Sequence, residues 1–238
     1  MSDLKLDVRV YPIDEPKNST LALASVAVND MVAIQGIRVI DSDSGAFVSM
    51  PQSYDKAAER YNDIAFPVTG ELRKAINEAV LEEYEIMANL PPEKRGYEKP
   101  DMTGAKNINA ENIKLNARVY LVKEPKNNTK AFAEITVDDL VAIRGVHVIE
   151  GKNEPFVSMP QTRDKYGEYK DVAFPINGDL RKEISRLVLE KYEDKAPKKI
   201  TNKSLADGLR KGAEKAARQN ANAPKETAAK SRYAGALE

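Results

Sequence analysis

Apolar and polar residues alternate in two stretches near the start of the chain. Apolar side chains occupy every second position from Leu6 to Val10 and again from Ala24 to Val28. Successive side chains of a β-strand point to opposite faces, so this period of two is typical of a strand with one buried face. The pattern therefore predicts two strands. Pro16, in the segment between them, presets the backbone for a turn.

Two further strands follow from the same alternation. The segment Val32–Ile40 is apolar at alternate positions, but its phase changes at Gly36, as a β-bulge would cause. Asn29–Asp30 directly before it predicts a tight hairpin turn. Phe47–Met50 is expected to be a short fourth strand, and the polar residues 52–62 after it a mobile loop.

A helix is predicted after the loop because the apolar spacing changes from two to three or four. Leu72, Ile76 and Val80 form a stripe that can pack on a sheet. Thr69 is a suitable N-cap, and Glu71 in the first turn complements the helix dipole. The predicted order of elements is therefore ββββα.

The whole pattern occurs twice. Leu6 aligns with Leu115, and the same offset holds without a gap up to Gln52 and Gln161. After the loss of one residue in the loop, residues 61–85 align with residues 169–193. Repetition of this kind indicates two copies of one structural unit.

The predicted fold class is α+β, with two tandem ββββα units that each form an antiparallel sheet with one packed helix. The expected division is residues 1–86 (repeat one), 87–112 (a linker), 113–194 (repeat two) and 195–238 (a basic tail). A unit of about 80 residues is near the small end of what buries a good core. We therefore expect the two sheets to pair within the chain as a pseudo-dimer.

Composition narrows the classes of function. The chain has no Cys and a single His, which excludes thiolate metal sites and cysteine nucleophiles and argues against histidine catalysis and zinc binding. It has no P-loop, dinucleotide glycine fingerprint or nucleophile elbow. We expect no enzyme activity, no metal, no cofactor and no small-molecule substrate. A charged N-terminus and the absence of long apolar runs predict a cytoplasmic protein that has no membrane partner.

The net charge of zero hides a gradient along the chain. Residues 1–85 carry 8 basic and 15 acidic side chains, a net charge of −7. Residues 113–193 carry 14 and 13, a net charge of +1, and residues 194–238 carry 11 and 5, a net charge of +6. Such asymmetry points to charged partners for the second half of the chain.

Four short motifs recur in the same order in both repeats. They are Ile37–Ile40, Phe47–Pro51, Asp63–Pro67 and Glu71–Arg73 in repeat one, and Val146–Ile149, Phe156–Pro160, Asp171–Pro175 and Asp179–Arg181 in repeat two. This series resembles the stage V sporulation protein G (septation) family, whose hallmark is a run like I-R-V-I, then F-V-A-M-P, a charged loop, D-I-A-H-P-I and a helix that begins D-x-R.

The resemblance implies a bacterial regulator of the sporulation and cell-division type that binds DNA or RNA and works as a homodimer. Here the two repeats would supply the dimer within one chain, and further homo-oligomers stay open. The family's His before Pro is replaced by Phe66 and Phe174. Its basic pair after M-P-S is reduced to Arg163 in repeat two and absent in repeat one, where Tyr54 stands.

Basic residues of repeat two and the tail are the candidate nucleic-acid contacts, because phosphate binding draws its affinity from Lys and Arg. They are Arg144, Arg163, Lys165, Lys170, Arg181, Lys182, Arg186, Lys198, Lys199, Arg210 and Lys211. The first four correspond to Gln35, Tyr54, Lys56 and Asn62 of repeat one, so three of those four positions gain positive charge. The helix residues have an equally good interpretation as a solvated face with pairs such as Arg186 and Glu190.

Aromatic residues supply a weaker candidate. Tyr11 and Tyr120, beside Arg9 and Arg118, could stack bases. Packing at the edge of the core is the favoured interpretation of both rings. His147 is interpreted as an ordinary strand residue, because nothing near it in the sequence completes a metal site.

The basic tail leaves alternatives open. Ser204 and Asp207 suggest a capping box and a short helix, followed by a disordered end. The tail could add affinity for nucleic acid or fold onto acidic repeat one and mask it. The rival function is a protein-interaction module in which repeat one recruits a basic partner without any nucleic acid.

Overall fold

The described residues of repeat one form seven strands and one long helix. In this computed structural model the described residues are 4–56, 58–96, 109–125, 127–163, 167–196 and 210. The strands are β1 (Leu6–Pro12), β2 (Thr20–Val28), β3 (Val32–Ile40), β4 (Phe47–Ser49), β5 (Gln52–Asp55), β6 (Arg60–Asp63) and β7 (Ala65–Pro67). Helix α1 (Gly70–Ala88) and a 3-10 turn (Pro92–Lys94) follow them.

Repeat two has the same order of elements. A 3-10 turn (Ala110–Asn112) at the end of the linker precedes it. Its strands are β8 (Leu115–Leu121), β9 (Thr129–Val137), β10 (Val141–Glu150), β11 (Pro155–Ser158), β12 (Gln161–Arg163), β13 (Tyr169–Asp171) and β14 (Ala173–Pro175), and its helix is α3 (Gly178–Lys195). The prediction of two antiparallel sheets with one helix each is confirmed.

The tight turns between the second and third strands of each repeat are confirmed. Asn29 and Asp30 have φ values of 49° and 54°, and Asp138 and Asp139 have 52° and 53°. Two successive residues with positive φ match the twist of the flanking strands, which is why Asn and Asp occupy these positions. The Asn29 side chain also accepts a hydrogen bond from the backbone N–H of Lys5 at 2.8 Å.

The predicted bulges are confirmed at the two equivalent glycines. Gly36 and Gly145 have φ values of +73° and +70°, a region that side chains with a Cβ adopt only at a cost. The pairing of β9 with β10 shifts register between Ile143 and Val146. The bulge reverses the alternation of faces along β10. Val146 is therefore buried like Ile143, although the two residues are three positions apart instead of two.

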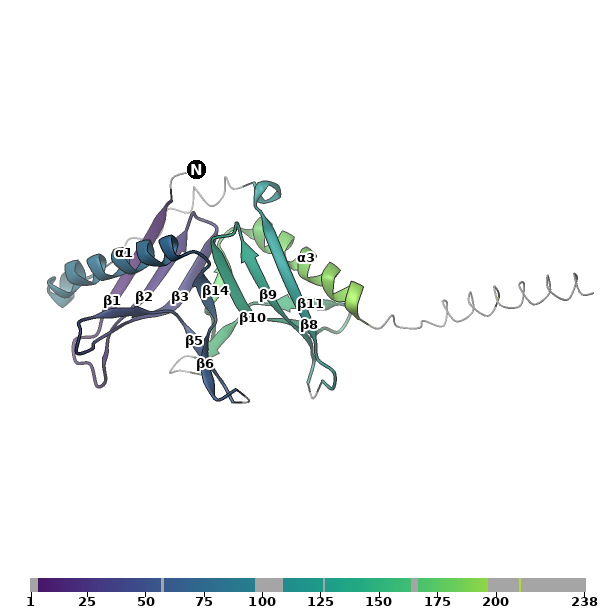
Figure 1. The fold of residues 1–238 in the computed structure, drawn as a ribbon, viewed down its shortest axis with the longest axis horizontal. Helices are drawn as coiled ribbons and strands as arrows, with labels where there is room; N and C mark the ends of the chain where they lie inside the picture. The colour runs from purple at the N-terminus through teal and green to yellow at the C-terminus, as the bar shows by residue number, and fades with distance from the viewer. Residues whose placement is uncertain are drawn as a thin grey trace, which may run out of the picture. The chain divides into compact units, whose positions relative to one another are not determined.

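Each helix begins at a side-chain cap and buries one stripe. The Thr69 hydroxyl accepts a hydrogen bond from the Leu72 N–H at 3.2 Å. The Asn177 side chain accepts two, from the N–H groups of Asp179 and Leu180 at 2.7 and 3.0 Å. The buried residues are Leu72, Ile76, Val80 and Met87 on α1, and Leu180, Ile184 and Val188 on α3. Figure 1 shows each helix beside the sheet of its own repeat.

The two repeats exchange a strand. β7 of repeat one pairs antiparallel with β10 of repeat two, and β14 of repeat two pairs with β3 of repeat one. Figure 1 shows β14 beside β3, a strand far from it in the sequence. Backbone hydrogen bonds extend both junctions: the Arg144 N–H donates to the Ile64 carbonyl, and the Gln35 N–H donates to the Val172 carbonyl, both at 2.7 Å.

Buried side chains continue from one repeat to the other through these strands. Ala65 of β7 and Ala173 of β14 are both fully buried, and they belong to one core cluster with residues from both sheets. The described residues up to Ala196 form one compact unit. Each sheet is therefore completed by backbone from the other repeat.

The expected mobile loop over residues 52–62 is wrong. Strands β5 and β6 form a hairpin there, and Gln52 pairs with Asp63 while Tyr54 pairs with Tyr61. Repeat two forms the equivalent hairpin from β12 and β13. The hairpin carries polar side chains on both faces, so it lacks the alternation on which the strand prediction depended.

Candidate nucleic-acid interface

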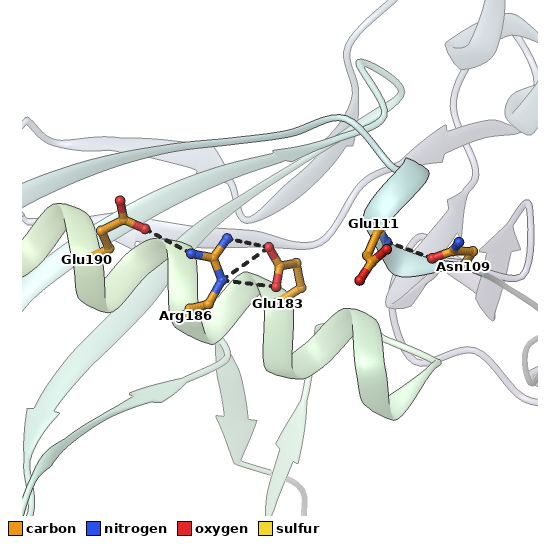
Figure 2. A network of polar contacts seen from close by, with 5 residues as sticks. All are labelled: Asn109, Glu111, Glu183, Arg186 and Glu190. Atoms are coloured by element: carbon orange, nitrogen blue, oxygen red, sulfur yellow. Dashed lines mark hydrogen bonds and ion pairs between the residues drawn. The ribbon is translucent and has the colours of Figure 1, made fainter.

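Basic residues on α3 are held by carboxylates. Arg186 donates to Glu183 at 2.5 Å and to Glu190 at 3.0 Å, as Figure 2 shows. The same view shows the Asn109 side chain accepting from the Glu111 N–H at 3.1 Å, which caps the 3-10 turn beside α3. The hydrogen bond from Arg186 holds the pKa of the Glu183 carboxyl below its ordinary value, so the pair stays ionised.

The other two helix candidates are paired in the same manner. Lys182 donates to Asp179 at 2.9 Å, and this hydrogen bond raises the pKa of Lys182. Arg181 lies 3.3 Å from Asp171 at the end of β13. The predicted contact between Arg186 and Glu190 is present, and the helix cations are largely balanced by neighbouring acids. Exposed pairs of this kind are worth little and can still rearrange toward a phosphate.

Arg144 lies at the junction of the two repeats. Its guanidinium carbon is 4.5 Å from the centroid of the Phe66 ring of β7, and its Nε is 3.3 Å from a Glu134 oxygen. A guanidinium over an aromatic face gains a cation–π interaction and is oriented by the ring. Phe66, which stands where the family has His, thus contacts and orients Arg144 of the other repeat.

Arg163 and Lys170 lie on the β12–β13 hairpin. The Arg163 Nε donates to the Gly167 carbonyl at 2.9 Å, and its guanidinium carbon is 5.9 Å from the centroid of the Tyr169 ring. Both Arg163 and Lys170 are exposed. Arg144 lies on β10 instead, so the strand candidates come from two separate elements of repeat two.

Several aromatic rings lie on the outer face of the repeat-two sheet, away from α3. Tyr120 is 54% exposed and Phe132 is 45% exposed. Tyr11, the equivalent of Tyr120, is also exposed at 51%. The interpretation of Tyr11 and Tyr120 as core-edge residues is therefore wrong, because neighbouring Val10 and Val119 fill the core positions instead.

A groove separates this outer face from the hairpin of repeat one. Its volume is about 890 Å³. Its lining residues are Ser53, Asp55, Arg60, Asn62, Asp63 and Ile64 from repeat one, and Tyr120, Glu134, Arg144, Gly145, His147, Pro160 and Gln161 from repeat two. The sequence did not indicate this groove, since it depends on the strand exchange that brings the hairpin against the other repeat.

His147 lies in the groove wall between these elements. Its ring is 5.0 Å from the Phe132 ring, centroid to centroid, at an interplanar angle of 88°. Partial burial lowers the pKa of His147 below 6.5, so the neutral imidazole is favoured. Among the described residues no group of three or more His, Cys, Asp or Glu side chains is placed to hold a metal ion.

The family of this protein is identified by a family model that matches both halves of the chain. A family model described as SpoVG matches residues 4–86 and again residues 113–194. The chain belongs to the SpoVG family. It is a tandem two-copy member, which confirms the resemblance seen in the motifs.

SpoVG relatives align over about the length of one repeat. The chain is 42% identical over 76 residues to the putative septation protein SpoVG of Myxococcus xanthus, covering 32% of this chain and 75% of the relative. It is 40% identical over 70 residues to that of Agathobacter rectalis, covering 29% and 80%. It is 37% identical over 91 residues to that of Anaeromyxobacter dehalogenans, covering 38% and 88%. All three relatives are named putative septation protein SpoVG.

Some site candidates of this SpoVG chain lie outside the described residues. They are Lys165, Lys198, Lys199 and Lys211, together with the capping box predicted at Ser204 and Asp207. Arg210 is described and exposed. Among the helices of the described ranges, none combines the length and apolar character needed to cross a membrane.

Proposed function

We propose that this SpoVG chain is a non-enzymatic regulator that binds DNA or RNA, with a role in septation or sporulation, and works in the cytoplasm. Phosphate contacts come from repeat two and the basic tail. Support for the cellular role comes from relatives named putative septation proteins. Support for the ligand comes from the exposed cations of repeat two.

The observation that carries the proposal is a difference between equivalent strand positions. Arg144, Arg163 and Lys170 are exposed in repeat two, whereas repeat one has Gln35, Tyr54 and Asn62 at the same places. Two of these cations lie near aromatic rings, Phe66 and Tyr169, which orient their guanidinium groups. Oriented cations on strands and hairpins suit contacts to a phosphate backbone.

Replacing the three strand cations tests the proposal. The Arg144→Gln/Arg163→Gln/Lys170→Gln variant should bind a labelled 20-nucleotide DNA or RNA roughly tenfold more weakly. Its affinity should also depend less steeply on salt concentration, because a protein with fewer phosphate contacts releases fewer counterions on binding. Fluorescence anisotropy at two salt concentrations measures both quantities.

The matched control removes the same number of positive charges from repeat one. Lys5 and Lys74 each lie against a carboxylate, at 2.7 and 3.7 Å, and Lys17 is exposed in the turn between β1 and β2. The Lys5→Gln/Lys17→Gln/Lys74→Gln variant should retain most of the affinity. Equal losses in the two variants would show that only overall charge matters, and would contradict an interface on repeat two.

A second candidate function is favoured by the surface of α1. The last turn of α1 has no basic residue, and Glu78, Glu82 and Glu85 are exposed along it. Such a face could recruit a basic protein partner without nucleic acid. If the strand-cation variant binds oligonucleotides as well as the unmodified chain does, this interaction module becomes the better account.

A further inference from the structure

The outer face of the repeat-two sheet carries a row of rings across three adjacent strands. Tyr120 of β8 is the direct cross-strand partner of Phe132 of β9, and Phe132 is the partner of His147 of β10. The Phe132 and His147 rings are in edge-to-face contact, with centroids 5.0 Å apart. The three rings therefore lie in one row across adjacent strands, and this row is called the strip below.

This strip is unusual for the solvent face of an antiparallel sheet. One face of such a sheet packs on the core and the other is normally polar. Here the core face is filled by Val119, Ala133 and Val148, while about half of the Tyr120 and Phe132 side chains is open to solvent. Contiguous exposed apolar surface on a soluble domain marks a binding surface.

The groove described above gives the strip a wall. The β5–β6 hairpin of repeat one lines one side of the 890 Å³ groove, and Tyr120, Arg144 and His147 line the other. A groove beside exposed rings admits an extended chain of flat groups. Bases of a single strand have this shape, since they are free to splay out and stack on aromatic side chains.

Two cations at the strip are available to phosphate groups. Arg60 and Arg118 are exposed, and among the described residues neither forms an ion pair with a carboxylate. The groove also contains three acids: Glu134 is paired with Arg144, Asp63 lies near Arg73, and Asp55, opposite Arg60 on the hairpin, accepts a hydrogen bond from the Ala58 N–H. Free cations beside stacking rings complement a nucleic-acid strand better than an acidic or purely apolar partner.

We propose that the strip of Tyr120, Phe132 and His147 is a binding platform for single-stranded nucleic acid. Bases stack on Tyr120 and Phe132, and the backbone runs past Arg60 and Arg118. This inference rests on the proposed function and deepens it by naming the strand state of the ligand and the site. Repeat one lacks an equivalent platform, because Leu23 and Arg38 replace Phe132 and His147.

The test compares two double variants in the full chain. Tyr120→Leu/Phe132→Leu removes the exposed stacking rings. Tyr54→Leu/Tyr61→Leu removes two rings from the hairpin that are at least half exposed and have centroids 5.1 Å apart. Their strand neighbours Asp55 and Arg60 line the groove, so the two Tyr rings point to the other side of the hairpin. Each variant is titrated with a labelled 12-nucleotide single strand and with the duplex of the same sequence.

The strip variant should bind the single strand at least about tenfold more weakly, because it loses two stacking contacts. Its binding to the duplex should change by less than about twofold, since paired bases are not free to stack on the protein. The hairpin variant should bind both probes as the unmodified chain does. Thermal unfolding of all three proteins checks that these surface changes leave the fold intact.

A third variant should raise the affinity, which damage to the fold cannot do. Glu134→Gln removes the carboxylate that holds Arg144 and repels phosphate. Single-strand binding should tighten by about two- to fivefold, in line with the small free energies of exposed ion pairs.

Other outcomes overturn the inference in distinguishable ways. If the unmodified chain binds the single strand but the strip variant binds it equally well, the platform is wrong and the proposed function stands. If the unmodified chain binds neither probe even in dilute buffer, both fail. If the strip variant instead abolishes self-association in sedimentation, the strip is a contact between copies of this chain.

Discussion

At the scale of single residues, the partner of a charged side chain decides what it can contribute. Lys182 and Arg186 satisfied the sequence criterion for phosphate contacts as well as Arg144 did, yet each lies against acids of its own helix. This pairing was predictable from the sequence, because the two cations lie three or four residues from Asp179, Glu183 and Glu190 on the same helix. The ring beneath Arg144 could not be anticipated, because Phe66 arrives from the other repeat.

His147 gives a direct check at this scale, because it is the single His of the chain. Its one imidazole signal in an NMR titration should report a pKa below 6.5, since burial disfavours the charged ring. Between the folded and unfolded pKa values the unfolded chain binds more protons, so stability should fall as the pH drops through that window.

The His147→Gln variant is the control for this titration. It should lack the contribution of that residue to the pH dependence of unfolding. A measured pKa at or above 6.5 would contradict the burial seen on β10.

At the scale of elements, the sequence predicted what depends on local patterns. Alternation predicted the long strands, Asn29–Asp30 predicted the hairpin turn, and Gly36 predicted the bulge. Strands β7 and β14 were missed because three residues ending in Pro carry too short a pattern. Their pairing is set by the other repeat, and the β5–β6 hairpin buries no apolar face whose pattern could reveal it.

The bulge glycines allow a prediction at this scale. Gly145→Ala should destabilise the chain by about 1 kcal/mol, because a residue with a Cβ is disfavoured at a φ of +70°. The added Cβ would meet Pro160 at 3.7 Å, an ordinary contact, so the cost comes from the backbone alone.

Gly178 at the start of α3 is the matched control for that substitution. Nothing lies within 4 Å of a Cβ added there. Gly178→Ala should be neutral or stabilise by up to about 1 kcal/mol. Urea denaturation measures both variants, and equal effects would rule out the bulge as the reason.

At the scale of the whole molecule, strand exchange turns two similar repeats into one asymmetric body. Each sheet receives one strand from the other repeat, and the buried residues form a shared core. The framework is duplicated, but the exposed residues on it have diverged in charge and aromatic content. One chain thereby presents a more basic, aromatic face from repeat two and an acidic helix from repeat one.

The most direct test is an equilibrium titration of the unmodified chain with labelled single-stranded and double-stranded oligonucleotides, in dilute buffer and at physiological salt. The proposed function predicts binding that weakens steeply between the two salt concentrations, with a slope set by the number of phosphate contacts. Absence of binding in dilute buffer, or an affinity that is the same at both salt concentrations, would contradict it.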